Sequence, residues 1–103
     1  MRIFARRTLP AFVDSLSGRK DQQAVKAAID AWFDEVSKAQ WANAADVKRR
    51  YASASIVSAE RIVFNIKGND YRLIARLAYP AQILAIRFFG THSEYDKIDA
   101  ETV

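Results

Sequence analysis

Hydrophobic residues in the first half of the chain recur every three or four positions, which is the period of an α-helix. The clearest stretch begins after Asp21, whose carboxylate is placed to cap the first turn, and continues to about Lys38. Its apolar positions keep to one face: Val25, Ala28, Ile29, Trp32, Phe33 and Val36. We therefore predict one long amphipathic helix that places Trp32 and Phe33 in the core.

Two shorter helices are predicted on either side of this one. Thr8 is a suitable N-cap for a helix over residues 9–16, where the apolar residues again form one stripe. Asn43 and Asp46 have the three-residue spacing of a capping arrangement, which predicts a helix that ends near Tyr51.

From Arg61 onward the hydrophobic period falls to two, which is the period of a β-strand. Three strands are predicted in succession, over residues 61–67, 70–79 and 82–89. Gly68–Asn69 and Pro80–Ala81 supply turn residues between them, so we expect an antiparallel meander. Residues 52–59 are interpreted as a connecting loop with some β character at Ile56 and Val57, and residues 3–5 as a candidate for a short first strand.

Alternation along the three strands sorts their side chains onto two faces. One face is apolar and includes Leu73 and Phe88, so we expect the helices to cover it. The other face is expected to be open, with Ile74, Ile83 and Phe89 scattered among its cations. These cations are Arg61, Lys67, Arg72, Arg76 and Arg87. The predicted fold class is therefore α+β, with N-terminal helices packed on one face of an antiparallel sheet.

The distribution of charge makes the basic face a candidate binding surface. The chain carries 16 Lys and Arg residues against 12 Asp and Glu residues, and residues 61–89 hold five cations against Asp70 alone. We expect five cations and no acid on this one small face, and like charges repel, which costs stability unless an anion binds there. A phosphate backbone is the natural partner. The alternative is a solvent-facing sheet whose charges serve solubility only.

Length and composition exclude several classes of protein. A chain of 103 residues fits a single domain, 1–103. The absence of cysteine excludes disulfides and thiolate chemistry, and a single histidine argues against a multi-histidine metal centre, so we expect no metal and no cofactor. The chain has neither an apolar run near the roughly 20 residues that span a bilayer nor a secretory signal pattern. We expect a soluble, cytoplasmic protein without a membrane partner.

Two further polar groups lie outside the predicted strands. Thr91 and Glu94 have the spacing of a capping box, which predicts a short C-terminal helix with Gly90 ending the last strand and His92 at the helix start. Earlier in the chain, Lys48, Arg49 and Arg50 form a basic triplet. We interpret this triplet either as a solvated face or as a group that contacts phosphate.

Three segments resemble the HigB-type toxins of bacterial toxin–antitoxin modules. The longest are Val63–Ile74, which reads VFNIKGNDYRLI, and Ile86–Asp99, which reads IRFFGTHSEYDKID. The segment Val36–Trp41 is similar to the family's helix end. The resemblance implies a RelE-like fold and a ribosome-dependent mRNA endonuclease, or mRNA interferase, whose active surface is the open sheet face with the segment after the last strand.

The location that the resemblance implies holds the candidate site residues. Those with a catalytic role are Arg72, Arg87, His92 and Tyr95, and those for RNA or ribosome binding are Lys48, Arg49, Arg50, Arg61, Lys67, Arg76 and Lys97. Histidine can transfer protons near neutral pH, and arginine can stabilise charge on a phosphate. Tyr95 could stack on a base or move a proton. The sequence does not decide which residue is the acid and which the base.

The resemblance also implies the partners. These are mRNA and the ribosome, together with a cognate antitoxin of the helix-turn-helix, HigA-like kind, through which alone the toxin would reach operator DNA. Two alternatives use the same basic face without catalysis: an RNA-binding module, and an interaction domain for an acidic protein.

Overall fold

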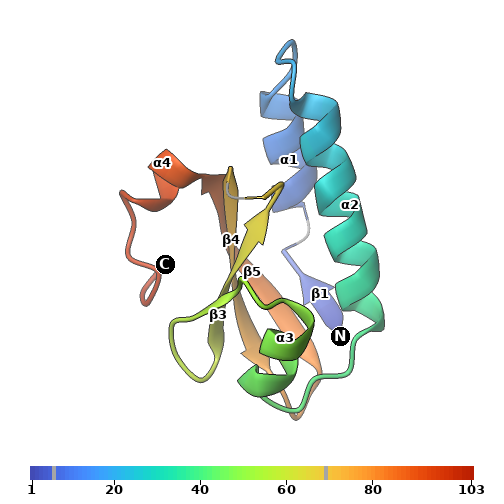
Figure 1. Ribbon diagram of the computed structural model, residues 1–103, viewed down its shortest axis with the longest axis vertical. Coiled ribbons are helices and arrows are strands. Elements are labelled where there is room, and N and C mark those ends of the chain that lie inside the picture. Colours follow the sequence, from blue (N-terminus) through green and yellow to red (C-terminus); the bar gives the residue numbers. More distant parts are fainter. Residues whose placement is uncertain (6, 69) are drawn as a thin grey trace.

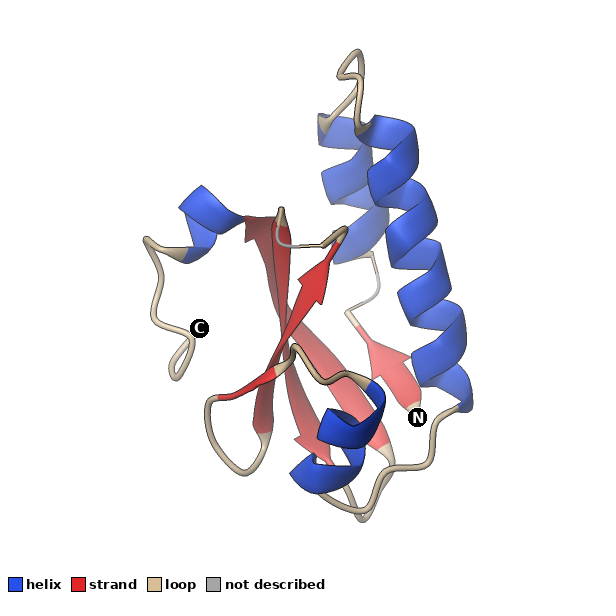
Figure 2. Cartoon of the chain, in the orientation of Figure 1, coloured by secondary structure: helices blue, strands red, loops and turns tan. Residues whose placement is uncertain are grey.

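Among residues 1–5, 7–68 and 70–103, which the computed structural model describes, five strands form one sheet with helices on both sides (Figures 1 and 2). The elements in chain order are β1(Arg2–Phe4), α1(Thr8–Ser15), α2(Gln22–Lys38), α3(Ala44–Arg50), β2(Ser55–Ile56), β3(Arg61–Ile66), β4(Tyr71–Ala78), β5(Ile83–Thr91) and α4(His92–Tyr95). Figure 1 shows α1 and α2 along one side of the sheet, and α4 with the red C-terminal segment on the other. The predicted α+β class is thus confirmed.

The helices begin close to the predicted positions, but their caps differ. Asn43 caps α3 as expected, accepting the backbone N–H of Asp46 at 3.0 Å. Thr8 is the first residue of α1 and not its N-cap, and the N-cap residue, Arg7, makes no side-chain capping bond. Asp21 does precede α2, but its carboxylate accepts the O–H of Tyr71 at 2.6 Å instead of capping the helix. The side chain that was expected to stabilise a helix end therefore joins α2 to the sheet.

The sheet has the strand order β1-β5-β4-β3-β2. Strands β3, β4 and β5 form the predicted antiparallel meander, but β1 pairs in parallel with β5. The sheet is therefore mixed, and the expectation of a purely antiparallel sheet was wrong. Strand β2, Ser55–Ile56, pairs with β3 at the predicted β character of Ile56, and β1 lies one residue before the candidate strand at residues 3–5. Strands this short carry too few positions for alternation to indicate which strand they pair with, or in which direction.

The turn between β3 and β4 uses the left-handed backbone region that glycine adopts without strain. Gly68 has a φ of +64°, and Lys67 before it has a φ of +52°. Asn69, which was predicted to complete this turn, lies outside the described residues.

Strand β5 contains one residue more than its partner strand. Residues 74 and 75 of β4 pair with residues 88 and 86 of β5, which leaves Arg87 as the extra residue of a β-bulge. A bulge shifts the alternation of the residues that follow it, because side chains point to opposite faces with a period of two.

The bulge exchanges the faces expected for two phenylalanines. Phe89 lies in the core, whereas Phe88 is half-buried and pairs with Ile74 on the opposite face. The prediction for both residues was therefore wrong. Gly90 does not end the strand either, since β5 continues through Thr91.

Aromatic rings fill the core between the helices and the sheet. Phe64 lies at its centre, with ring centroids 5.4 Å from Trp32 and 5.2 Å from Tyr51. Trp32 and Leu73 are buried as predicted, while Phe33 is only half-buried at the edge of the core. None of the described helices is both long and apolar enough to cross a lipid bilayer.

The opposite face of the sheet is not open. Val63 and Ile74 point away from the helix-side core, yet they are only 2% and 0% exposed. The expectation of a solvent-facing basic surface was therefore wrong in part: the cations surround a covered apolar patch.

Candidate functional site

The C-terminal segment crosses the sheet face that carries the predicted cations. The guanidinium group of Arg61 donates from Nη1 to the backbone oxygens of Ala100 at 3.3 Å and Val103 at 2.6 Å. Arg87 donates from Nε to the same Val103 oxygen at 3.3 Å. Because Arg61 is on β3 and Arg87 on β5, the segment passes over β4, which lies between them. Two guanidinium groups from different strands thus converge on one oxygen atom.

Arg72 and Tyr95 form a second pair beside α4. The guanidinium carbon of Arg72 lies 6.0 Å from the centroid of the Tyr95 ring, which is within the range of a cation–π interaction. Arg72 pairs across the sheet with Gly90, two residues before His92. This register brings the pair next to the start of α4.

His92 is held at the start of α4 by the predicted capping box. Thr91 accepts the N–H of Glu94 at 3.2 Å, and the Glu94 carboxylate accepts the N–H of Thr91 at 2.9 Å. The imidazole is 53% exposed, and its Nδ1 lies 3.2 Å from the Oδ2 of Asp96. Asp96 therefore occupies one ring nitrogen and leaves Nε2 for another partner.

The same histidine lines a polar cleft of about 420 Å³. Its other walls are formed by Arg19, Asp21, Asp70, Tyr71, Thr91 and Ser93. Within the described part of the chain, no hydrogen bond or ion pair joins His92 to Arg87. The candidate catalytic residues therefore form two groups, one around Arg87 and one around Arg72, Tyr95 and His92.

The remaining cations of this face are paired with acids or exposed. Arg76 is bound to Glu60, with both Nε and Nη2 at 3.1 Å from Oε2. Lys67 lies 3.3 Å from Asp70, and the side chain of Lys97 is exposed. The expectation of a face without acids was thus wrong, because Glu60 reaches it from the loop before β3.

The basic triplet of α3 lies apart from these groups. Lys48 donates to the backbone oxygens of Ala52 and Ala54, Arg49 pairs with Asp46, and Arg50 pairs with Glu35. Helix α3 itself packs on the helix-covered side of the sheet through Val47, while the tyrosine that ends it, Tyr51, contacts Phe64. All three cations thus bind groups of their own chain, as a solvated helix end would.

Two contributors to the site were not found from the sequence. Asp96 follows His92 by four residues, a spacing that places two side chains on one helix face and could have indicated the pair. Residues 99–103 carry no comparable signal, because they act through backbone oxygens, which every residue has.

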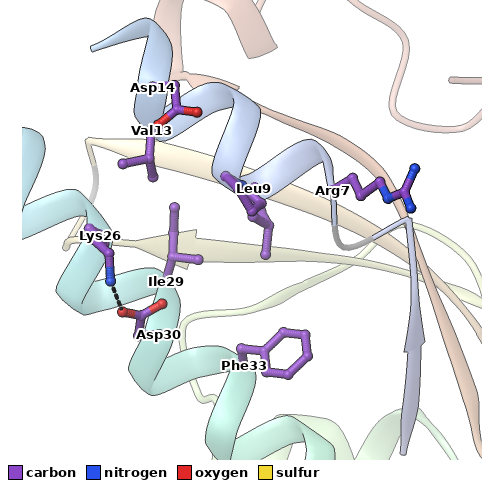
Figure 3. Close-up of a pocket in the computed structure, with 9 residues that line it drawn as sticks. Arg7, Leu9, Val13, Asp14, Lys26, Ile29, Asp30 and Phe33 are labelled. Atoms are coloured by element: carbon purple, nitrogen blue, oxygen red, sulfur yellow. Dashed lines mark hydrogen bonds and ion pairs between the residues drawn. The ribbon is translucent and has the colours of Figure 1, made fainter. Parts of the chain in front are cut away.

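A larger groove of about 520 Å³ lies between α1 and α2, on the side of the sheet away from Arg61 and Arg87 (Figure 3). Leu9, Val13, Ile29 and Phe33 line it, and charged residues at its edge include Lys26 and Asp30, whose Nζ and Oδ2 are 2.7 Å apart. The groove explains why Phe33 is only half-buried. It contains none of the candidate catalytic residues.

Asp21 and Tyr71 hold the polar cleft together and shift each other's titration. The hydrogen bond from Tyr71 lowers the pKa of the Asp21 carboxyl group. Burial, followed by the contact with Asp21, raises the pKa of the Tyr71 hydroxyl to about 12. The pair is therefore most stable when the carboxyl group is ionised and the phenol is protonated.

Replacing Tyr71 by phenylalanine is expected to lower the melting temperature by a few degrees at pH 7. The ring would keep its stacked position on Phe89, with centroids 5.8 Å apart, and only the hydrogen bond would be lost. The difference from wild type should shrink as the pH falls through the lowered pKa of Asp21, below about 4. It should also shrink between about pH 10 and 12, where the wild-type phenol ionises. Thermal melts across this pH range test both limits, and a difference independent of pH would contradict the assignment.

Comparison with known proteins finds one family. Residues 25–98, well over half of the chain, match the family model HigB_toxin, described as the RelE-like toxic component of a toxin-antitoxin system. No curated protein matches the chain. Among the described residues, no group of three or more His, Asp or Glu side chains is placed to hold a metal ion.

Proposed function

Because the chain belongs to the HigB family of RelE-like toxins of toxin–antitoxin systems, we propose that it is a ribosome-dependent mRNA endonuclease that inhibits translation. The observation that carries this proposal is the convergence of Arg61 and Arg87 on one oxygen atom, on the face that also holds Arg72. Tyr95 and His92 belong to α4, which follows β5 directly. Two guanidinium groups around one oxygen are suited to a phosphodiester.

The proposed reaction is attack by a 2′-hydroxyl group on the adjacent phosphorus atom. The bond from O2′ to phosphorus forms while the bond to O5′ breaks, which gives a 2′,3′-cyclic phosphate and a 5′-hydroxyl end. A base removes the proton from the 2′-hydroxyl group, and an acid supplies one to the departing O5′. Negative charge accumulates on the non-bridging oxygens in the transition state, where Arg87 and Arg61 would stabilise it.

His92 is the proposed proton-transfer residue. Its contact with Asp96 fixes the ring through Nδ1, so that Nε2 is free to face the substrate. A base oriented by a third group is the usual arrangement in proton-transfer sites. Since the sequence has no second histidine, the partner acid or base would be Tyr95, a lysine such as Lys67 or Lys97, or ribosomal RNA.

Arg72 and Tyr95 are proposed to hold the nucleotide. Stacking on Arg72 fixes one face of the Tyr95 ring, and the other face could receive a base. The basic triplet Lys48, Arg49 and Arg50, with Arg76 and Lys97, would contact ribosomal RNA.

The family implies a cognate antitoxin as protein partner. We propose that this antitoxin is a helix-turn-helix protein of the HigA kind, that it alone contacts operator DNA, and that the toxin acts in the cytoplasm on ribosome-bound message.

The test is to add the purified chain to ribosomes programmed with a defined message and to map the 5′ ends of the products. We expect new 5′-hydroxyl ends that depend on the ribosome and on His92. The alternative, a noncatalytic RNA-binding module, would stop translation while leaving the message intact, and its affinity would be insensitive to His92→Ala. Intact message at complete inhibition would overturn the proposed enzyme.

A further inference from the structure

Asp99 folds the segment 99–103 into a turn over the sheet face that carries Arg61 and Arg87. The backbone oxygen of Asp99 accepts the N–H groups of Thr102 and Val103, at 3.1 and 3.0 Å. The Asp99 carboxylate accepts the N–H of Glu101 at 2.9 Å. These three bonds form a compact turn over residues 99–103. The turn aims the backbone oxygens of Ala100 and Val103 at Arg61.

The oxygens of this turn occupy the donors that a phosphate would need. Arg61 and Arg87 both donate to the Val103 oxygen, so a phosphate oxygen bound between them would take the same place. A phosphodiester carries a full negative charge and two non-bridging oxygens, so it can bind both guanidinium groups at once through charge-assisted hydrogen bonds. The segment can therefore be displaced by RNA and still hold the arginines in its absence.

The negative charges of the segment also oppose the binding of a phosphate to the two arginines. Asp99 and Glu101 place two carboxylates on a turn that contacts two guanidinium groups. While the segment is in place, these carboxylates lower the positive potential that would attract a phosphate backbone. Figure 1 shows the segment against the sheet on the side away from α1 and α2.

We propose that residues 99–103 are an internal competitor for RNA: they occupy the Arg61–Arg87 pair until a phosphodiester displaces them. This inference rests on the proposed function, since it takes RNA as the ligand of that face. Only molecules in which residues 99–103 have left the two arginines can bind RNA. The apparent affinity for RNA is therefore the intrinsic affinity multiplied by the fraction of such molecules. The internal competitor would keep the toxin from binding free RNA weakly and indiscriminately. Productive binding would then require the additional contacts that the ribosome supplies.

The experiment compares Asp99→Ala with Asp99→Asn in the full chain. Both substitutions remove one negative charge, but asparagine keeps an oxygen that can accept the N–H of Glu101. The probe is a fluorescent single-stranded RNA with 2′-O-methyl groups, which the proposed reaction cannot cleave. Asp99→Ala is expected to bind the probe about tenfold more tightly than Asp99→Asn. The reason is that alanine loses the hydrogen bond to Glu101, which stabilises the turn in its place over the arginines.

A second measurement follows the segment directly. In the wild-type chain, saturating probe should accelerate hydrogen exchange at the amides of Thr102 and Val103, whose bonds to Asp99 belong to the closed turn. The proposal is overturned if Asp99→Ala and Asp99→Asn bind the probe equally tightly. It is also overturned if RNA slows hydrogen exchange at the amides of Thr102 and Val103. Weaker binding by Asp99→Ala would show instead that the segment contributes to the RNA site.

Binding by Arg87→Ala and cleavage on ribosomes test the proposed function independently of the internal competitor. If Arg87→Ala binds the probe less tightly than wild type, the face binds RNA even where the competitor is refuted. If the wild type and all three variants fail to bind, the inference is overturned. Cleavage of message on programmed ribosomes then decides whether the proposed function also fails.

Discussion

Arg87→Ala is expected to slow the cleavage of ribosome-bound message by about 10²–10³-fold in single-turnover reactions with saturating enzyme. The guanidinium group lies where it can donate to a non-bridging phosphate oxygen, as it now donates to Val103. Charge on that oxygen grows as the transition state forms, so the interaction is stronger there than in the bound substrate. The loss should therefore appear in the cleavage rate and much less in ribosome binding.

A matched control removes an equivalent guanidinium group on the other side of the molecule. Arg7 is exposed and lines the groove between α1 and α2, where it makes no side-chain cap to α1. Arg7→Ala makes the same change in net charge and should cleave at close to the wild-type rate once bound. If Arg87→Ala also cleaves at the wild-type rate, Arg87 serves docking alone and the active site lies elsewhere.

Long periodic segments of this chain could be predicted from the sequence. Helix α2 and the strands β3 to β5 contain enough repeats of their period for one face to be distinguished from the other. The bulge at Arg87 could not be predicted in this way. Phe88 and Phe89 are equally apolar, so the pattern fits either face, and the pairing with β4 decides between them.

The sequence predicted which arginines share a sheet face, but not which groups they contact there. Alternation correctly placed Arg72, Arg76 and Arg87 on the face away from α2, as their contacts with Tyr95, Glu60 and Val103 show. It could not indicate what else lies there. Glu60 is 16 residues from Arg76 in the chain, and the C-terminal segment binds through its backbone. Such contacts depend on the path of the chain and leave no period in the sequence.

Ile74→Ala measures how completely this face is covered, and it is expected to lower the free energy of unfolding by about 2–5 kcal/mol. Ile74 is 0% exposed on β4, in a row with Val63 and Phe88 on the sheet face that carries Arg61 and Arg87. Removing its side chain would leave a cavity that the rigid strands cannot close. Because small domains have only about 5–15 kcal/mol of stability, the urea midpoint should fall markedly.

The control for this substitution is Ile56→Ala, which removes the same atoms from a side chain that is 47% exposed on β2. Its effect should stay within about 0.5 kcal/mol, as is usual for surface positions. A large loss at Ile74 with a small one at Ile56 means that this apolar row is covered in solution. Equal, small losses would mean that the face is open and that Arg61 and Arg87 are free to bind RNA without displacing anything.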